Sequence, residues 1–386
     1  MRDEATVEEA QELLEELVRI PSINPRDAQG PAEGAIGEFV AGWLQEAGLE
    51  VSIQEVLPNR HNVIARLPGR DSGRTLLLEG HLDTVEVDGM TVEPYSASVR
   101  NGRLFGRGAC DAKGSLAAFM LALRRLARGD TRPQLDVVLA AVIDEEYRGR
   151  GILHLLDAWD ARRRVVGALV GLPTRLGLVI GHKGAVRFRI RTSGRGAHSA
   201  QPWEGDNAID HMNEVMDFIR DNLSPQLSRV RHPLVGQPTI VTTAIQGGRD
   251  GNVVPHECEL TLNRWTVPGE DPMSVWSRYK VAVEAVAPGK VEVDPPLNLS
   301  DAMETPVGAN VVAALTDILA AHGLPARPVG GPYSSDGGKM SKRSIPCVLF
   351  GPGSMSDAHQ PNESIDLGEV VTAIEVVFDL AGRFAA

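Results

Sequence analysis

The fold follows from an apolar stretch that runs into a polar one, TLLLEGHLDTV at residues 75–85. Residues 75–79 have the length of a β-strand, and three consecutive leucines put apolar side chains on both of its faces. A strand that is apolar on both faces is typically buried between layers of helices. We therefore expect residues 75–79 to lie inside a covered sheet, with His81 and Asp83 just beyond the strand's carboxyl end.

Other apolar runs of strand length occur along the chain, and amphipathic stretches separate them. The strand-like runs are residues 49–56, 62–67, 136–143, 167–170 and 346–350. The stretches with helical spacing of apolar residues are 5–19, 33–47, 114–128, 149–160 and 308–322. This alternation of buried strands and helices predicts an α/β fold with helices on both faces of a central sheet.

The pattern changes between residues 183 and 293. An alternating strand at 184–192 is followed by a helix at 206–222, strands at 238–245 and 253–262, a helix at 271–287 and a strand at 290–294. The order β-α-β-β-α-β predicts a ferredoxin-like α+β domain. We expect residues 183–293 to be inserted into the α/β domain, which then comprises residues 1–182 and 294–386.

The composition is that of an acidic globular protein. Its 386 residues suffice for two or three domains at roughly 100–200 residues each. Lys and Arg number 39 against 51 Asp and Glu, a net charge of −12, which argues against nucleic-acid and membrane binding because both need a basic face. The three cysteines form no C-x-x-C pair, and we see no signal-peptide core and no run of ~18 apolar residues. We therefore expect a cytoplasmic protein.

Residues with metal-binding chemistry follow several of the predicted strands. They are His81 and Asp83 after strand 75–79, Glu145 and Glu146 after strand 136–143, and His359 after strand 346–350. A glycine-rich loop, GRGACDAKG at 106–114, adds Asp111. Sites in open α/β sheets form at the carboxyl ends of strands, so these side chains should meet at one edge. Imidazole nitrogens and carboxylate oxygens are the ligands of a catalytic zinc-type site.

Each of these residues also has an ordinary structural explanation. Asp83 can accept the second ring N–H of His81, because residues i and i+2 of an extended chain face the same side, but a buried histidine beside a turn aspartate has the same sequence. Of Glu145 and Glu146, one could bind a metal while the other takes a proton from water, or both could form a solvated turn. Asp111 could approach a metal, or cap the helix that follows it.

A series of motifs runs along nearly the whole chain: GHLDTV (80–85), GRGACDAKG (106–114), DEEYRGRG (144–151), IGHKGAVRFRI (180–190), GRGAHSAQPWEGDNAI (194–209), NVVPHECELTL (252–262), VPGE (267–270), SSDGG (334–338) and AHQPNE (358–363). In this order they resemble the co-catalytic zinc aminoacylase/carboxypeptidase superfamily, of the acetylornithine deacetylase, succinyl-diaminopimelate desuccinylase and glutamate carboxypeptidase type. The resemblance implies a zinc-exopeptidase-like catalytic domain with a mixed sheet, and an inserted lid domain through which two chains dimerise.

The resemblance also implies a role for each residue of the metal site. Asp111 would bridge two zinc ions, with manganese or cobalt as alternatives. His81, oriented by Asp83, would bind one ion. The other ion would be completed by Glu146 and His359, with Glu145 as the general base that activates water.

Two lid residues acquire roles in the same way. His198 is similar to the lid histidine that reaches the partner's active site in the dimer and stabilises the tetrahedral oxyanion. Asn252 resembles a lid residue that contacts substrate.

The sequence departs from the family pattern at two positions. Where the family has an acidic ligand for the ion that His81 binds, this chain has Leu172, which leaves that ion only His81 and Asp111. Where the family has an arginine that grips a substrate carboxylate, this chain has Trp265, which favours an aromatic contact. The neighbouring Arg264 stays a candidate substrate contact, although strand alternation points it to the opposite face.

Three functions fit these observations. The first is a metal-dependent amidohydrolase of the deacylase or peptidase type, which cleaves a small-molecule amide with Glu145 as base and possibly holds a single tight metal ion. The second is a biosynthetic enzyme on the same scaffold that forms or rearranges an amide or C–N bond. The third is a non-catalytic binding protein, which the cluster of acids disfavours because buried carboxylates are costly without a cation. We favour the first.

Overall fold

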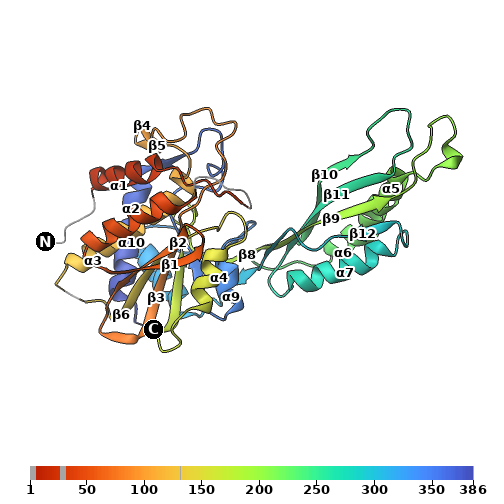
Figure 1. Ribbon diagram of the computed structural model, residues 1–386. Coiled ribbons are helices and arrows are strands. Elements are labelled where there is room, and N and C mark those ends of the chain that lie inside the picture. Colours follow the sequence, from red (N-terminus) through yellow and green to blue (C-terminus); the bar gives the residue numbers. More distant parts are fainter. Residues whose placement is uncertain (1–5, 27–31, 131, 386) are drawn as a thin grey trace. The chain divides into compact units, whose positions relative to one another are not determined.

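The structure, a computed structural model, describes residues 6–26, 32–130 and 132–385 and divides the chain into two compact units (Figure 1). Unit 1 comprises Met1–Ile180, Thr305–Val329 and Lys339–Ala386, and unit 2 comprises Gly181–Glu304 and Gly330–Gly338. The sequence set the limits of the second part at 183 and 293, without the short segment Gly330–Gly338. The chain passes through unit 1 at Thr305–Val329 and then rejoins unit 2 at Gly330–Gly338. No local sequence pattern indicates this return.

The centre of unit 1 is a sheet with the strand order β1-β2-β6-β3-β7-β16 and then β8. Its strands are β1 (Glu50–Leu57), β2 (Arg60–Leu67), β3 (Asp71–His81), β6 (Leu135–Val142), β7 (Arg164–Val170), β8 (Val179–His182) and β16 (Cys347–Leu349). Strands β6, β3, β7 and β16 are parallel, whereas β1, β2 and β8 pair antiparallel to their neighbours. The predicted α/β class with a mixed sheet is therefore confirmed.

Helices cover both faces of this sheet. Gly37 of α2 (Gly34–Glu46) packs beside Val63 of β2. Asn62, the preceding residue of β2, donates a hydrogen bond to the carbonyl of Gly151 in α4 (Arg150–Asp157). Successive residues of a strand face opposite sides, so α2 and α4 lie on opposite faces. Every residue of β6 is buried, as a strand covered on both faces requires.

Apart from α5 (Ala208–Phe218), α6 (Ser224–Leu227) and α7 (Pro272–Glu284) of unit 2, the helices are α1 (Val7–Arg19), α2 (Gly34–Glu46), α3 (Gly114–Arg128), α4 (Arg150–Asp157), α8 (Asn310–Ala321), α9 (Gly337–Lys342) and α10 (Leu367–Arg383). No helix in the part of the chain that the structure describes is both long and apolar enough to cross a bilayer.

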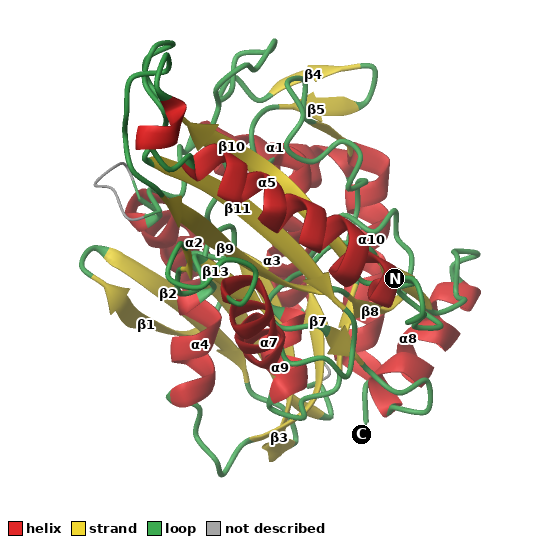
Figure 2. Cartoon of the chain, turned by 90° about the vertical axis from the view of Figure 1, so that its right-hand side faces the viewer, coloured by secondary structure: helices red, strands yellow, loops and turns green. Residues whose placement is uncertain are grey.

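Unit 2 has the predicted ferredoxin-like arrangement. Its elements follow one another as β9 (Gly184–Ser193), α5 (Ala208–Phe218), β10 (Thr239–Gly247), β11 (Glu257–Thr266), α7 (Pro272–Glu284) and β12 (Val291–Val293). The antiparallel sheet has the order β10-β11-β9-β12, and β13 (Asn298–Ser300) also pairs with β9. Figure 2 shows α5 and α7 lying over this sheet, and their apolar side chains share its core with β9 and β11.

Short elements complete the chain. Residues 219–223 connect α5 to α6 (Ser224–Leu227), and β14 (Met303–Glu304) and β15 (Val329–Gly331) lie near the limits of unit 2. In unit 1 a small sheet with the order β17-β5-β4 joins β4 (Ser98–Arg100), β5 (Arg103–Phe105) and β17 (Ser364–Asp366). Strand β5 leads into the glycine-rich loop, and β17 follows the segment that carries His359. The small sheet therefore ties these two segments together.

Candidate metal centre

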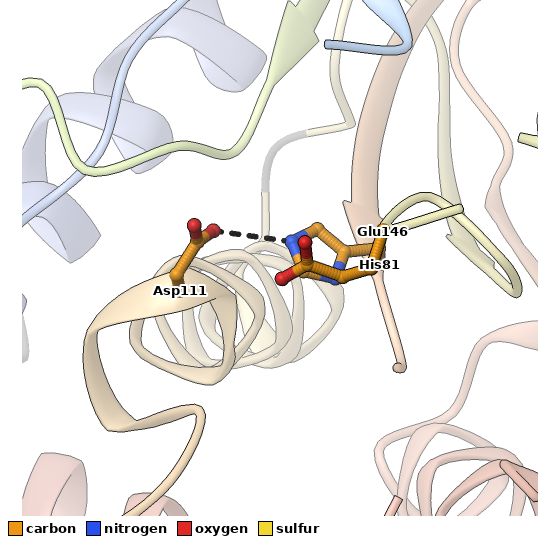
Figure 3. A group of neighbouring side chains, drawn as sticks. All are labelled: His81, Asp111 and Glu146. Atoms are coloured by element: carbon orange, nitrogen blue, oxygen red, sulfur yellow. Dashed lines mark hydrogen bonds and ion pairs between the residues drawn. The ribbon is translucent and has the colours of Figure 1, made fainter. Parts of the chain in front are cut away.

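Three predicted ligands from distant parts of the sequence meet at the carboxyl edge of the central sheet. His81 ends β3, Asp111 lies in the loop before α3, and Glu146 lies in the turn after β6. One ligand atom from each lies within 4.8 Å of those of the other two. Figure 3 shows the three side chains and the contact between His81 and Asp111. The Nε2 atom of His81 is 3.2 Å from Oδ1 of Asp111. The parallel strands β3 and β6 end side by side, which explains why their polar termini converge.

His359 adds a fourth donor to this cluster. Its Nε2 atom lies 3.3 Å from Oδ2 of Asp111 and 3.0 Å from Oε1 of Glu146. The two oxygens of Asp111 therefore face different histidines, which is the geometry of a carboxylate that can bridge two ion positions. The side chain of His359 is 43 % exposed, whereas that of Asp111 is 5 % exposed, so the cluster opens to solvent on the His359 side.

The donor set fits a divalent cation. Zinc–ligand bonds of about 2.0–2.1 Å in a tetrahedral arrangement separate neighbouring ligand atoms by about 3.3 Å. The observed separations between the imidazoles and carboxylates are 3.0 to 3.3 Å. Asp111 and Glu146 are largely buried carboxylates close together, and such a pair is costly without a positive partner. These four residues could hold a metal of the zinc, manganese or cobalt type.

The electrostatics of the cluster show how strongly it attracts positive charge. Hydrogen bonds to Asp111 and Glu146 raise the pKa of His359 to about 11. Burial by itself would raise the pKa of Asp111, but hydrogen bonds from His359 and His81 outweigh burial and lower it. Burial raises the pKa of Glu146 although His359 opposes the shift. The two carboxylates therefore favour positive charge in the cluster, whether on an imidazole or as a bound cation.

Asp83 contacts both His81 and the turn that follows β6. The Nδ1 atom of His81 lies 2.9 Å from the backbone carbonyl of Asp83, which fixes the imidazole, whereas the carboxylate of Asp83 is 3.7 Å away, beyond hydrogen-bond range. That carboxylate instead accepts the backbone N–H groups of Glu145 at 3.1 Å and Glu146 at 3.0 Å. Asp83 thus fixes the imidazole of His81 through its backbone carbonyl, and its carboxylate lies on the same side of the ring as an ion-pair partner. The orienting role of that carboxylate stays a prediction. Two adjacent N–H groups of the turn point at the carboxylate, while the nearer carbonyl binds the imidazole.

The turn that carries Glu145 and Glu146 is fixed by buried polar contacts. Asp144, at its start, has φ 68°, in the left-handed region that non-glycine residues rarely adopt. The carboxylate of Asp144 accepts hydrogen bonds from Arg150 at 2.6 Å and from Asn24 at 3.1 Å, and Asn24 also donates to Asp83 at 2.7 Å. His359 likewise has a positive φ of 62°. Residues held in such conformations cluster at functional sites.

A comparison with family models decides what kind of protein this is. The model for "Peptidase family M20/M25/M40" matches residues 77–383, which include all four clustered residues. The chain belongs to peptidase family M20/M25/M40. As an M20 member it is a metallo-hydrolase.

Relatives and solved structures agree with this membership. The M20 chain is 30 % identical over 390 residues to an acetylornithine deacetylase of Yersinia pestis, with 97 % of each chain covered. It is also 30 % identical to the acetylornithine deacetylase of Proteus mirabilis, covering 97 % of this chain and 96 % of the relative. Its fold is similar to the M20 metallo-carboxypeptidase Sso-CP2 of Sulfolobus solfataricus (TM-score 0.81, 18 % identity, 97 % and 99 % covered). Its fold is also similar to a dinuclear metal-binding M20 peptidase of Bacillus subtilis (TM-score 0.71, 17 % identity, 97 % of each chain covered).

In this M20 chain, Leu172 lies level with His81 along the sheet. Strand β7 pairs Val170 with Glu79 of β3, so Leu172 lies two residues beyond that pair, as His81 does on the neighbouring strand. The side chain of Leu172 is 4 % exposed. An aliphatic side chain offers no ligand atom, so the position beside His81 lacks the acid that the family pattern has there.

Two predicted residues of unit 2 lie together. His198 and Val253 form an isolated β-bridge, and the N–H of Ser199 donates to the carbonyl of Asn252 at 2.8 Å. His198 is exposed, and its Nδ1 atom accepts the N–H of Ala200 at 3.1 Å. A neutral imidazole that accepts at Nδ1 carries its proton on Nε2. His198 therefore presents a hydrogen-bond donor beside Asn252.

Arg264 and Trp265 have different environments within unit 2. The side chain of Arg264 is 1 % exposed and binds Glu270 at 2.6 Å and the Tyr279 hydroxyl at 3.1 Å. Its guanidinium is therefore satisfied inside the unit, and the proposal that Arg264 contacts substrate is withdrawn. Trp265 is half-buried on β11, paired with Thr239 and Ala185.

Sequence reasoning missed three residues that shape the site. Asn24 connects to the site across 59 residues, and no local pattern marks it. Arg107 and Glu363 form a buried ion pair of 2.6 Å beside Asp111. Arg107 lies in the motif GRGACDAKG and Glu363 in the motif AHQPNE. The acid four residues after the predicted ligand His359 was the sequence feature that could have indicated Glu363.

Proposed function

We propose that this M20 metallo-hydrolase cleaves the amide bond of a small N-acylated molecule and holds one tight zinc ion, with manganese or cobalt as alternatives. Asp111, Glu146 and His359 would hold the ion, with His81 beside them. The observation that supports this most is the convergence of His81, Asp111 and Glu146, with His359 at 3.3 Å from Asp111 and 3.0 Å from Glu146. Leu172, which has no ligand atom, stands where a further acid is expected. When bound, the ion would act as a Lewis acid toward water and the amide carbonyl.

Glu145 acts as the general base in this mechanism. It neighbours Glu146 in a turn that Asp83 and Asn24 hold. Burial lowers the pKa of His81, but hydrogen bonds to Asp111 and Asp83 and the charge of Glu145 outweigh burial and raise it, so Glu145 lies near the same cluster. Glu145 takes a proton from the attacking water and returns it to the leaving nitrogen.

The lid supplies stabilisation and selectivity in this proposal. His198 donates from Nε2 to the carbonyl oxygen as negative charge develops there, and Asn252, its neighbour, contacts the substrate. The relatives named acetylornithine deacetylase favour an N-acylated amino compound. Trp265, in place of a carboxylate-binding arginine, favours an apolar or aromatic group in the substrate. We also propose that the protein is a cytoplasmic homodimer.

The test is the isosteric variant Glu145→Gln, assayed on a panel of N-acylated amino compounds. Hydrolysis should fall by about 10²–10⁴-fold because the amide cannot accept the proton, while the metal content stays that of the wild type. The matched variant Glu146→Gln should lose metal as well as activity. A metal-loaded wild type that cleaves nothing on the panel would contradict the proposal. Transfer products formed in the presence of a nucleophilic amine would favour the biosynthetic alternative. The departures from the family pattern at Leu172 and Trp265 are the observation that favours that alternative.

A further inference from the structure

The carboxylate of Glu363 is buried next to the metal cluster and is fully engaged. Glu363 as a whole is 1 % exposed. One oxygen, Oε1, accepts the backbone N–H of Cys110 at 2.9 Å and that of Asp111 at 3.1 Å. The second oxygen, Oε2, binds Nη1 of Arg107 at 2.6 Å. Glu363 thus holds the backbone of Asp111, whose two side-chain oxygens face His81 and His359.

Arg107 is the positive partner of the Glu363 carboxylate, and it offsets the free-energy cost of burying that charge. Its side chain is 3 % exposed, and its Nε atom donates to the carbonyl of Glu86 at 2.9 Å. Its backbone N–H donates to the carbonyl of Pro94 at 2.8 Å. Arg107 is therefore fixed at several points, and it fixes Glu363 in turn.

The pair joins the two segments that carry the ligands of one ion. Glu363 lies four residues after His359, and Arg107 lies four residues before Asp111. The N–H of Gly106 donates to the carbonyl of Glu363, and the small sheet continues the connection through the pairing of Ser364 with Phe105. The buried ion pair thus links the glycine-rich loop to the His359 segment close to the metal cluster.

We propose that Arg107 and Glu363 are a positioning pair that sets metal affinity, by holding Asp111 and His359 at ligand distance from each other. The pair touches neither substrate nor ion and acts through the backbone of Asp111. This inference rests on the proposed metal site, and it adds two residues to that site. Partners of this kind typically change metal affinity by 10–100-fold when they are altered.

The experiment measures the Kd of zinc by competition with a chromogenic chelator, and the visible spectrum of the cobalt-loaded protein, for wild type and Glu363→Gln. The variant should bind zinc 10–100-fold more weakly and show a changed cobalt spectrum, because the amide places a donor against Arg107 and weakens the hold on Asp111. If Glu363→Gln does not fold, the charge-neutral double variant Arg107→Gln/Glu363→Gln is measured in its place, with the same expectation.

Asp136→Asn is the matched control. Asp136 is a buried carboxylate that likewise binds an arginine, Arg66 at 2.7 Å, and a backbone N–H, that of Gly69 at 2.9 Å. It lies near the start of β6, roughly 20 Å along the strand from the metal cluster. Its variant should lose stability and keep the zinc Kd and cobalt spectrum of the wild type.

Two results would overturn the inference alone. One is a Kd and a spectrum for the tested variant that match the wild type, and the other is an equal loss of affinity in Asp136→Asn. A wild-type chain that binds neither zinc nor cobalt would overturn the proposed function together with this inference.

Discussion

At the scale of single residues, the proposed count of one ion rests on one aliphatic side chain. Leu172 is buried level with His81, whose Nε2 atom already faces one oxygen of Asp111. A carboxylate at position 172 would give a second ion three protein ligands, the number typical of a catalytic site. We therefore expect Leu172→Glu to raise the metal content from about one to about two ions per chain, measured by elemental analysis after gel filtration.

The uncharged variant Leu172→Gln controls for the change of shape. It should keep about one ion per chain, because an amide is a poor ligand for zinc and carries no charge. A wild-type chain that already holds two ions would show that another group replaces the missing acid.

At the scale of elements, the sequence predicts best where strands are long and buried. The run at 136–143 corresponds to β6 (Leu135–Val142), and its parallel neighbours end at one edge, so His81 and Glu146 could be brought together by reasoning from strand ends. Strand β11 was expected at 253–262 but spans Glu257–Thr266, because Val253 forms only an isolated bridge with His198. Strands β4, β5 and β17 have three residues each, too few to show a period, and were missed.

The turn between β6 and α4 yields a prediction at this scale. Asn24 lies far away in sequence, yet its amide donates to Asp83 at 2.7 Å and to Asp144 at 3.1 Å, and so supports the turn that carries Glu145. Asn24→Ala removes hydrogen bonds to two carboxylates and should lower the free energy of unfolding by about 1.5–3 kcal/mol. Because the turn positions the base rather than the substrate, kcat should fall about tenfold with little change in KM.

The variant Asn24→Asp tests the charge part of this explanation. A third carboxylate next to Asp83 and Asp144 offers no donor and adds repulsion, so it should reduce stability and kcat more than Asn24→Ala does. Equal kcat values for Asn24→Ala and the wild type, measured at saturating substrate, would show that the turn does not depend on this residue.

At the scale of the whole molecule, unit 2 has an edge that suits a second copy of the chain. Strand β10 is the outer strand of its sheet, and Val241 and Ile245 on it are 49 % and 53 % exposed. Long, apolar, exposed edge strands tend to pair with another chain. This supports the proposed homodimer, in which His198 would serve the site of the partner.

Mixing two inactive variants tests whether the protein works as such a dimer. Glu145→Gln lacks the base and His198→Ala lacks the lid donor, so neither homodimer should be active. If His198 serves the partner's site, each mixed dimer has one site with an intact Glu145 and an intact His198. Random exchange of subunits after mild dissociation makes half of the dimers mixed, so about a quarter of the wild-type activity should return. If His198 serves its own chain, every site lacks one group and the mixture should stay as inactive as its components.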